Sequence, residues 1–226
     1  TEDELAFLDT SAPGDTPLRR HVNGQRAFYD WTRGAGTAEE ILYILGILLH
    51  PENAEIPFPL IFTGPETSRE YFVQINQFIS DTLGPEAQQR YKIIIDDPEL
   101  VAREMLEGIR QVREFRKAHS DAYYFNWLLK IDHEFQKPFQ PTHENMRNLS
   151  LHKNQPTHLL AAQLRRAFSG VVAGNVKDDG IRSIEEHGNF EIHGDKDIMG
   201  PMDALLASFV AQHRMKLAGT AYVPCY

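Results

Sequence analysis

The stretch Gly34-Ala35-Gly36-Thr37-Ala38-Glu39-Glu40, followed by an apolar run from Ile41 to Leu49, decides the fold of this chain. The run is apolar on most sides, which is typical of a largely buried helix. Thr37 is a good N-cap and Glu40 stands three residues later, so the pair fits a capping box. Pro51 is expected to end the helix. A glycine turn that leads into a buried helix requires a strand before it.

Two short apolar segments farther along the chain are predicted to be strands, at 58–63 and 91–96. Helices are expected at about 66–83 and at 98–118, the second with Asp97 as N-cap and a proline at its first position. Short apolar strands that alternate with helices indicate a parallel sheet with crossover helices. The predicted fold class is therefore α/β, although only two of the three implied strands are visible.

The two ends of the chain differ from this pattern. Residues 1–33 have scattered apolar positions interrupted by glycine and proline, and they are interpreted as a polar leader without a clean helix or strand. From about residue 119 a second, mostly helical domain is expected. Its predicted elements are helices near 157–170, 181–186 and 196–217 and a short strand at 190–192.

Composition narrows the functional classes. The chain has 226 residues, 42% of them hydrophobic and 24% charged, which is ordinary for a globular protein. A net charge of −9 makes it a poor general binder of nucleic acid or anionic lipid. No run of apolar residues is long enough to span a membrane. The single cysteine excludes an internal disulfide and a thiolate zinc cage.

The histidines and the paired basic residues give weak signals. His133-Glu134 and His143-Glu144 lack a second histidine four residues after the first, so neither is a zinc-protease motif, and the histidines are interpreted as scattered surface or loop residues. Arg165-Arg166 and Arg214 with Lys216 are interpreted as solvated basic spots rather than anion sites.

The glycine turn and the acids after it have two interpretations each. The turn is either a tight turn with a helix cap, or an anion site in which Gly34 and Gly36 allow close approach and the Thr37 hydroxyl donates to a phosphate. Glu40 either completes the capping box or stands beside a bound phosphate sugar, where it stabilises a cationic ribosyl transition state or activates water. Glu39 is expected to be a solvated acid.

The segment Gly34–Glu40 resembles the end of the Pro-Gly-Gly-x-Gly-Thr-x-x-Glu motif of the LOG (Lonely Guy) family. From about Gly34 to Tyr226 the chain also resembles the bacterial pyrimidine/purine nucleotide 5'-monophosphate nucleosidases. The segments that carry this second resemblance are Leu60–Pro65, Tyr91–Asp97, His143–Met146, Leu164–Gly170, Val172–Lys177 and Phe209–Lys216.

The resemblance implies hydrolysis of the N-glycosidic bond of a nucleoside monophosphate in the cytoplasm, without a metal or redox cofactor. Gly34, Gly36 and Thr37 would hold the 5'-phosphate, and Glu40 occupies the position of the catalytic glutamate. The implied fold is the C-terminal half of a Rossmann-like LOG domain at 34–118, followed by the nucleosidase C-terminal domain at 119–226. That domain is linked in the family to homo-oligomer assembly and to control by guanosine tetraphosphate-type alarmones.

Departures from the family pattern leave a second function open. Thr32-Arg33 stands where the family has Pro-Gly, and the family's upstream half, with its catalytic arginine, has no counterpart in the printed sequence. The hypothesis is a truncated or frame-disrupted derivative whose residues 1–33 are not homologous. Half a parallel sheet is expected to expose an edge strand and an apolar face. The alternative function is a catalytically incomplete fragment that acts as an oligomerisation or alarmone-binding module.

Overall fold

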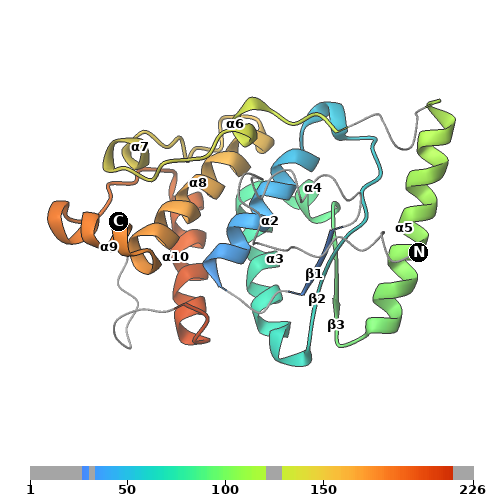
Figure 1. Cartoon of the computed structure of the whole chain (residues 1–226), viewed down its shortest axis with the longest axis horizontal. Helices are drawn as coiled ribbons and strands as arrows, with labels where there is room; N and C mark the ends of the chain where they lie inside the picture. Colours follow the sequence, from blue (N-terminus) through green and yellow to red (C-terminus); the bar gives the residue numbers. More distant parts are fainter. Residues whose placement is uncertain (1–26, 31–33, 121–128, 216–226) are drawn as a thin grey trace.

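A parallel sheet of three strands forms the centre of the N-terminal half of the described chain (Figure 1). The computed structural model describes residues 27–30, 34–120 and 129–215. The strands are β1 (Ala27–Asp30), β2 (Leu60–Gly64) and β3 (Lys92–Ile95), in the order β1-β2-β3. Their register places Ala27 beside Leu60 and Ile61 beside Lys92. The described part of the chain therefore confirms the α/β class, with a small sheet and mostly helical structure.

The strand β1 corrects the prediction that residues 1–33 hold no strand. It pairs in parallel with β2 along its whole length and supplies the strand that the glycine turn requires. Its sequence Ala-Phe-Tyr-Asp contains two aromatic residues, which favour strands when a neighbouring strand is available. Residues 27–30 form a strand because they pair with β2, which is distant in sequence, so their local sequence pattern does not predict the strand.

Helices follow each strand and then fill the C-terminal half of the chain. The first group is α2 (Ala35–Leu48), α3 (Arg69–Leu83), α4 (Pro85–Gln88) and α5 (Pro98–Ala118). The second group is α6 (His133–Gln136), α7 (His143–Arg147), α8 (Thr157–Val176), α9 (Asp178–His187) and α10 (Lys196–Ala211). Two short 3₁₀ turns, η2 (Pro51–Asn53) and η3 (Glu66–Ser68), follow α2 and β2.

Two predicted elements of the C-terminal half are wrong in detail. Residues 190–192 form no strand; the nearby pairing is an isolated bridge between Leu151 and Gly194. Helix α10 ends at Ala211 rather than near residue 217. The chain leaves the helix there because His213 has a positive φ of 55°, and the Arg214 amide turns back to the Phe209 carbonyl at 2.8 Å.

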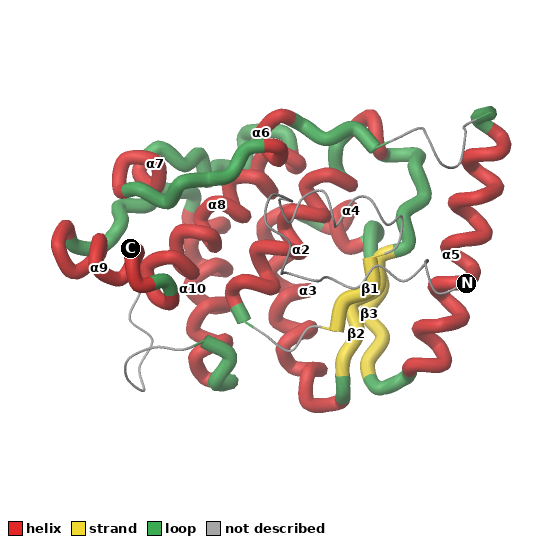
Figure 2. The backbone as a smooth tube through the Cα atoms, viewed as in Figure 1, coloured by secondary structure: helices red, strands yellow, loops and turns green. Residues whose placement is uncertain are grey.

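Alternating side chains of β2 face two different layers, as the two-residue period of a strand requires. Leu60 and Phe62 point into the core that α2 and α3 share, while Ile61 packs with Val101 and Met105 of α5. Helix α5 therefore covers one face of the sheet, and α2 and α3 cover the other (Figure 2).

The C-terminal helices add a further layer on α2 and α3. Helix α8 packs along α2, and α10 packs along α3. The ring centroids of Tyr71 and Phe209 lie 5.2 Å apart, and those of Phe78 and Phe168 lie 5.6 Å apart. One buried cluster thus includes side chains from both sides of the predicted boundary between residues 118 and 119.

The outer surface carries two exposed large apolar side chains among the described residues, Val73 at 52% and Leu106 at 68%. They lie on α3 and α5, the helices that flank the sheet. None of the helices in the described ranges has the length and apolar character needed to cross a membrane.

The start of α5 confirms the predicted cap and gives a first testable expectation. Asp97 accepts a hydrogen bond from the Leu100 amide at 2.8 Å, and Pro98 occupies the first helical position. Changing Asp97 to alanine should lower the free energy of unfolding by about 1 kcal/mol, measured by urea denaturation. The control is Glu99→Ala at the next exposed acid of the turn. Equal urea midpoints for the two variants would show that the cap contributes nothing.

Candidate active site

Helix α2 begins three residues earlier than the sequence predicts, because Gly34 and not Thr37 is its N-cap. The helix starts at Ala35 with Gly34 as N-cap, and no side chain caps it. The amide of Thr37 donates to the Gly34 carbonyl at 3.1 Å, so Thr37 lies inside the first turn. The predicted capping box of Thr37 and Glu40 is therefore wrong. A capping side chain binds the free amides at the start of a helix. Glu40 has no such role here, so its carboxyl group is available for chemistry.

The two glycines of the turn have different surroundings. A Cβ atom on Gly34 would lie 2.2 Å from the Arg214 carbonyl oxygen, so only glycine fits against this backbone. A Cβ atom on Gly36 would meet nothing within 4 Å, and Gly36 is exposed. Gly34 is thus a packing requirement, while Gly36 leaves open space directly over the first turn of the helix.

Tyr71 and Arg214 support this turn from α3 and from the segment after α10. The Tyr71 hydroxyl donates to the Gly34 carbonyl at 3.2 Å, and the Arg214 guanidinium lies 4.9 Å from the centre of the Tyr71 ring. Arg214 also donates to the Thr67 carbonyl at 3.0 Å, just after β2. The prediction of a solvated Arg214 is wrong, because this half-buried residue packs its guanidinium over the Tyr71 ring. The sequence signal for it was weak: Arg214 stands within the segment Phe209–Lys216 that carries the family resemblance.

Thr37 is buried against Tyr71. Its side chain is 7% exposed, and a hydrogen bond with the Thr37 hydroxyl partly offsets the raised pKa that burial gives to Tyr71. A phosphate contact by this hydroxyl therefore requires it to rotate away from Tyr71. The backbone amides that precede Thr37 in the turn need no such change, because the first amides of a helix lack intrahelical partners.

Glu40 stands one turn along α2 from the glycines. Its side chain is exposed at the surface, yet protein atoms crowd its carboxyl group. This partial loss of solvent, followed by repulsion from the neighbouring Glu39 carboxylate, raises the pKa of Glu40 to about 7. A carboxyl group with a pKa near neutrality exchanges protons readily at physiological pH, as general acid–base chemistry requires.

Glu39 has a structural position, contrary to the expectation of a solvated acid. It is half-buried, and its Oε1 atom lies 3.8 Å from Nε of Arg165 on α8. Burial raises its pKa, and the Arg165 charge and a hydrogen bond with Ser169 partly offset this. Arg165 in turn lies 5.1 Å from the centre of the Tyr43 ring. The prediction of a solvated Arg165 is also wrong, since it joins α2 to α8.

These residues meet at the carboxyl edge of the sheet, where open α/β sheets bind ligands. The turn after β1 offers free amides and the positive end of the α2 dipole, and Arg214 adds a positive charge. The Ser68 hydroxyl, just after β2, is buried and has no hydrogen-bond partner within the described residues. This arrangement has the features that an anion site requires, and the Glu40 carboxyl group stands beside it.

Comparison with known proteins agrees with this geometry. A family model described as "Pyrimidine/purine nucleotide monophosphate nucleosidase, C-terminal" matches residues 109–226, which is just over half of the chain. The chain belongs to this family. The membership confirms the nucleosidase resemblance and the assignment of this chain to the C-terminal portion of such proteins.

Three relatives extend the nucleosidase match toward the N-terminus. Proteins named pyrimidine/purine nucleotide 5'-monophosphate nucleosidase from Escherichia coli strains K12, CFT073 (O6:H1) and O157:H7 are each 56% identical to the chain over 193 residues. The alignment covers 85% of this chain and 42% of each relative. The chain thus spans about two fifths of the length of the curated relatives it matches.

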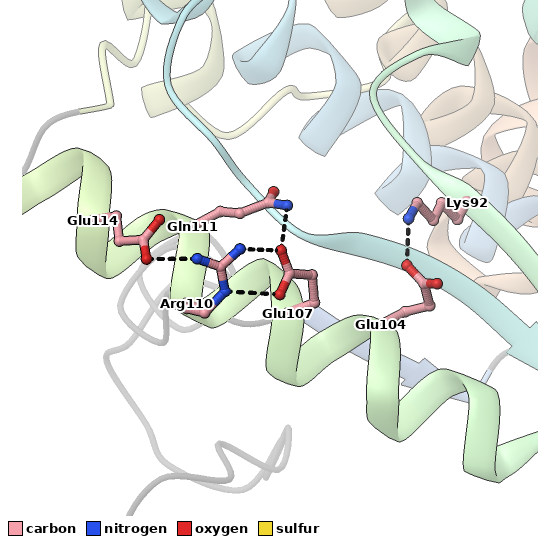
Figure 3. A network of polar contacts seen from close by, with 6 residues as sticks. All are labelled: Lys92, Glu104, Glu107, Arg110, Gln111 and Glu114. Carbon is pink, nitrogen blue, oxygen red and sulfur yellow. Dashed lines mark hydrogen bonds and ion pairs between the residues drawn. The ribbon is translucent and has the colours of Figure 1, made fainter.

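A groove of about 270 Å³ lies at the opposite edge of the sheet in this nucleosidase-family chain. It is lined by the amino ends of β2 and β3 and by α5. Along α5, Arg110 forms ion pairs with Glu107 and Glu114, and Lys92 of β3 forms an ion pair with Glu104 of α5 (Figure 3). Hydrogen bonds from Arg110 and Gln111 lower the pKa of Glu107 to about 2, so this carboxylate stays ionised. The groove contains neither the glycine turn nor Glu40, the carboxyl group with a pKa near 7. We therefore do not regard it as the candidate active site.

Proposed function

We propose that this chain acts in the hydrolysis of nucleoside 5'-monophosphates to free base and ribose 5-phosphate. The observation that carries the proposal is the position of Glu40: it has a pKa of about 7 and no capping role, and it stands one turn beyond a glycine-bounded helix start. The names of the relatives support the same reaction class.

The 5'-phosphate would lie over the open surface at Gly36, held by first-turn amides and by the charge of Arg214. This position directs the ribose toward Glu40. In its ionised form Glu40 stabilises the positive charge that develops on the ribosyl carbon as the bond to the base breaks, or removes a proton from the attacking water. Water adds its oxygen to that carbon, and the base leaves with a proton.

We also propose that 34–118 is the C-terminal half of a Rossmann-like LOG domain and that 119–226 is the nucleosidase C-terminal domain. The strand β1 precedes this range but belongs to the same sheet, since it pairs with β2. The alternation of parallel strands and helices up to α5 supports the first part. The relatives align over 193 residues, so the match continues N-terminal to residue 109, where the family-model match begins. Homo-oligomer assembly, control by alarmones and a cytoplasmic location stay predictions from the family resemblance.

The test is a product assay on the purified chain. We expect incubation with AMP, GMP, CMP or UMP to release free base and ribose 5-phosphate in equal amounts, measured by chromatography. If no base is released while an alarmone or a full-length nucleosidase subunit still binds, the chain acts as the oligomerisation or regulatory module, and the hydrolase proposal fails for it.

The pKa of Glu40 predicts the pH dependence of this reaction. Because the ionised carboxylate is the active form, the rate should rise as pH increases through about 7 and level off above it. Changing Glu39 to glutamine removes the repulsion that helps to raise the pKa of Glu40, so the midpoint should move to lower pH. The measurement is kcat/KM for AMP between pH 5 and 9. A rate that falls over this range would assign Glu40 the role of an acid.

A further inference from the structure

Three side chains with metal-binding chemistry come together at the far end of α2 from Glu40. His50 follows the last turn of α2, Asp132 is the N-cap of α6, and His158 is the second residue of α8. One ligand-capable atom from each residue lies within 4.8 Å of the other two. Sequence analysis missed this cluster because it weighed only histidines at helical spacing, whereas these residues belong to three separate elements.

His158 contributes a buried imidazole to the cluster. Its side chain is buried, with 8% exposed, and the described ranges of the chain give its ring no hydrogen-bond partner. It packs instead against the His50 ring, with centroids 4.9 Å apart and planes at 57°. The ring of His158 can therefore offer a nitrogen to an ion, as neutral imidazoles commonly do.

The backbone at the start of α6 orients the Asp132 carboxylate. Its Oδ1 atom accepts a hydrogen bond from the Glu134 amide at 3.0 Å, which fixes the carboxylate at the start of α6. Neighbouring groups that orient a ligand in this way are typical of metal sites. The second carboxylate oxygen can then bind an ion together with the two imidazoles.

We propose that His50, Asp132 and His158 bind a divalent transition-metal ion of the zinc class. Two imidazoles and one carboxylate are a ligand set that suits zinc, with water as the fourth ligand. Bonds of about 2.0–2.2 Å place tetrahedral ligand atoms about 3.3 Å apart, so atoms that lie up to 4.8 Å apart approach one another by up to about 1.5 Å when the ion binds. The contact at 3.2 Å between the Glu52 amide and Nδ1 of His50 is exposed, and water can replace it.

The ion would fasten the end of α2 to α6 and α8, which belong to the C-terminal half. His50 is ten residues beyond Glu40, a separation of about 15 Å at the rise of an α-helix. The site is therefore too far from Glu40 to take part in bond cleavage. Its role is to hold the helix that carries Glu40 against α8, so its test does not depend on the hydrolase proposal.

The experiment titrates the chelator-treated full chain with Co²⁺ and follows the visible absorption that Co²⁺ gains in a site of low coordination number. We expect one equivalent to bind, Zn²⁺ to displace it, and Zn²⁺ to raise the melting temperature. His158→Gln and Asp132→Asn should each weaken binding at least about tenfold. Asparagine still caps α6, so Asp132→Asn separates loss of metal from loss of fold.

The matched control is His152→Gln. Nδ1 of His152 lies 2.9 Å from Oδ1 of Asp195, so it is also a histidine beside a carboxylate, but the pair is exposed. We expect this variant to bind Co²⁺ as the parent chain does. The proposal is overturned if the parent binds no Co²⁺, or if it binds Co²⁺ no more tightly than Asp132→Asn.

Discussion

Replacing Glu40 with glutamine should abolish most of the release of free base from AMP. The amide keeps the size of the side chain but can neither carry the negative charge nor accept a proton from water. General acid–base groups contribute about 10²- to 10⁴-fold to reaction rates, and we expect a loss of that size in kcat. The binding of AMP, measured by calorimetry, should change little because the phosphate is held elsewhere in the turn.

The control for this variant is Glu70→Gln. Glu70 is also an exposed acid near the start of a helix, α3, where it accepts a hydrogen bond from Gln74 at 2.8 Å. It should retain the parent rate. Circular dichroism checks that both variants fold. Unchanged base release by Glu40→Gln would remove Glu40 from the mechanism, whatever its pKa.

Gly34→Ala is expected to have the largest effect on the stability of the fold. Its methyl group would stand 2.2 Å from the Arg214 carbonyl oxygen, and both partners of this contact involve backbone, so neither yields cheaply. Overpacking of this kind lowers the free energy of unfolding by about 1–3 kcal/mol. The displaced segment also carries the guanidinium that lies over Tyr71, so AMP binding should weaken as well.

Gly36→Ala is the matched comparison, because the added methyl group meets nothing within 4 Å. Alanine is favoured over glycine in a helix by about 0.5–1 kcal/mol, so this variant should be more stable to urea than the parent. It should nevertheless bind AMP more weakly, since the methyl group fills the space proposed for the phosphate. If Gly36→Ala binds AMP as the parent does, the phosphate lies elsewhere.

Local sequence patterns correctly predicted the helices and strands that are stabilised by contacts between residues close in sequence. Asp97 and Pro98 mark the start of α5 because the cap is a contact within one turn. The strands β2 and β3 were visible because both are short and apolar. The predicted start of α2 is three residues late, because Gly34 is fixed there by Tyr71 and by the backbone of Arg214, which are remote in sequence.

The rest of the candidate site depends on contacts that no local pattern reveals. Arg214 reaches the glycine turn only because α10 packs along α3 and the chain then turns back. Glu39 resembles a solvated acid until α8 brings Arg165 beside it. A sequence can show that an acid follows a glycine turn, but the fold decides which of two adjacent acids is paired and which stays available.

Helix α2 is enclosed on both sides, by the sheet with α3 and by α8. Its N-terminus holds the glycine turn, and most of its apolar length is covered by residues from the far half of the chain. Because both halves of the chain pack against α2, a substitution on one side of this helix constrains the residues that fit on the other. The C-terminal half of this protein is therefore a poor candidate for exchange among relatives as an independent module, because a foreign α8 would have to reproduce the surface that fits this α2.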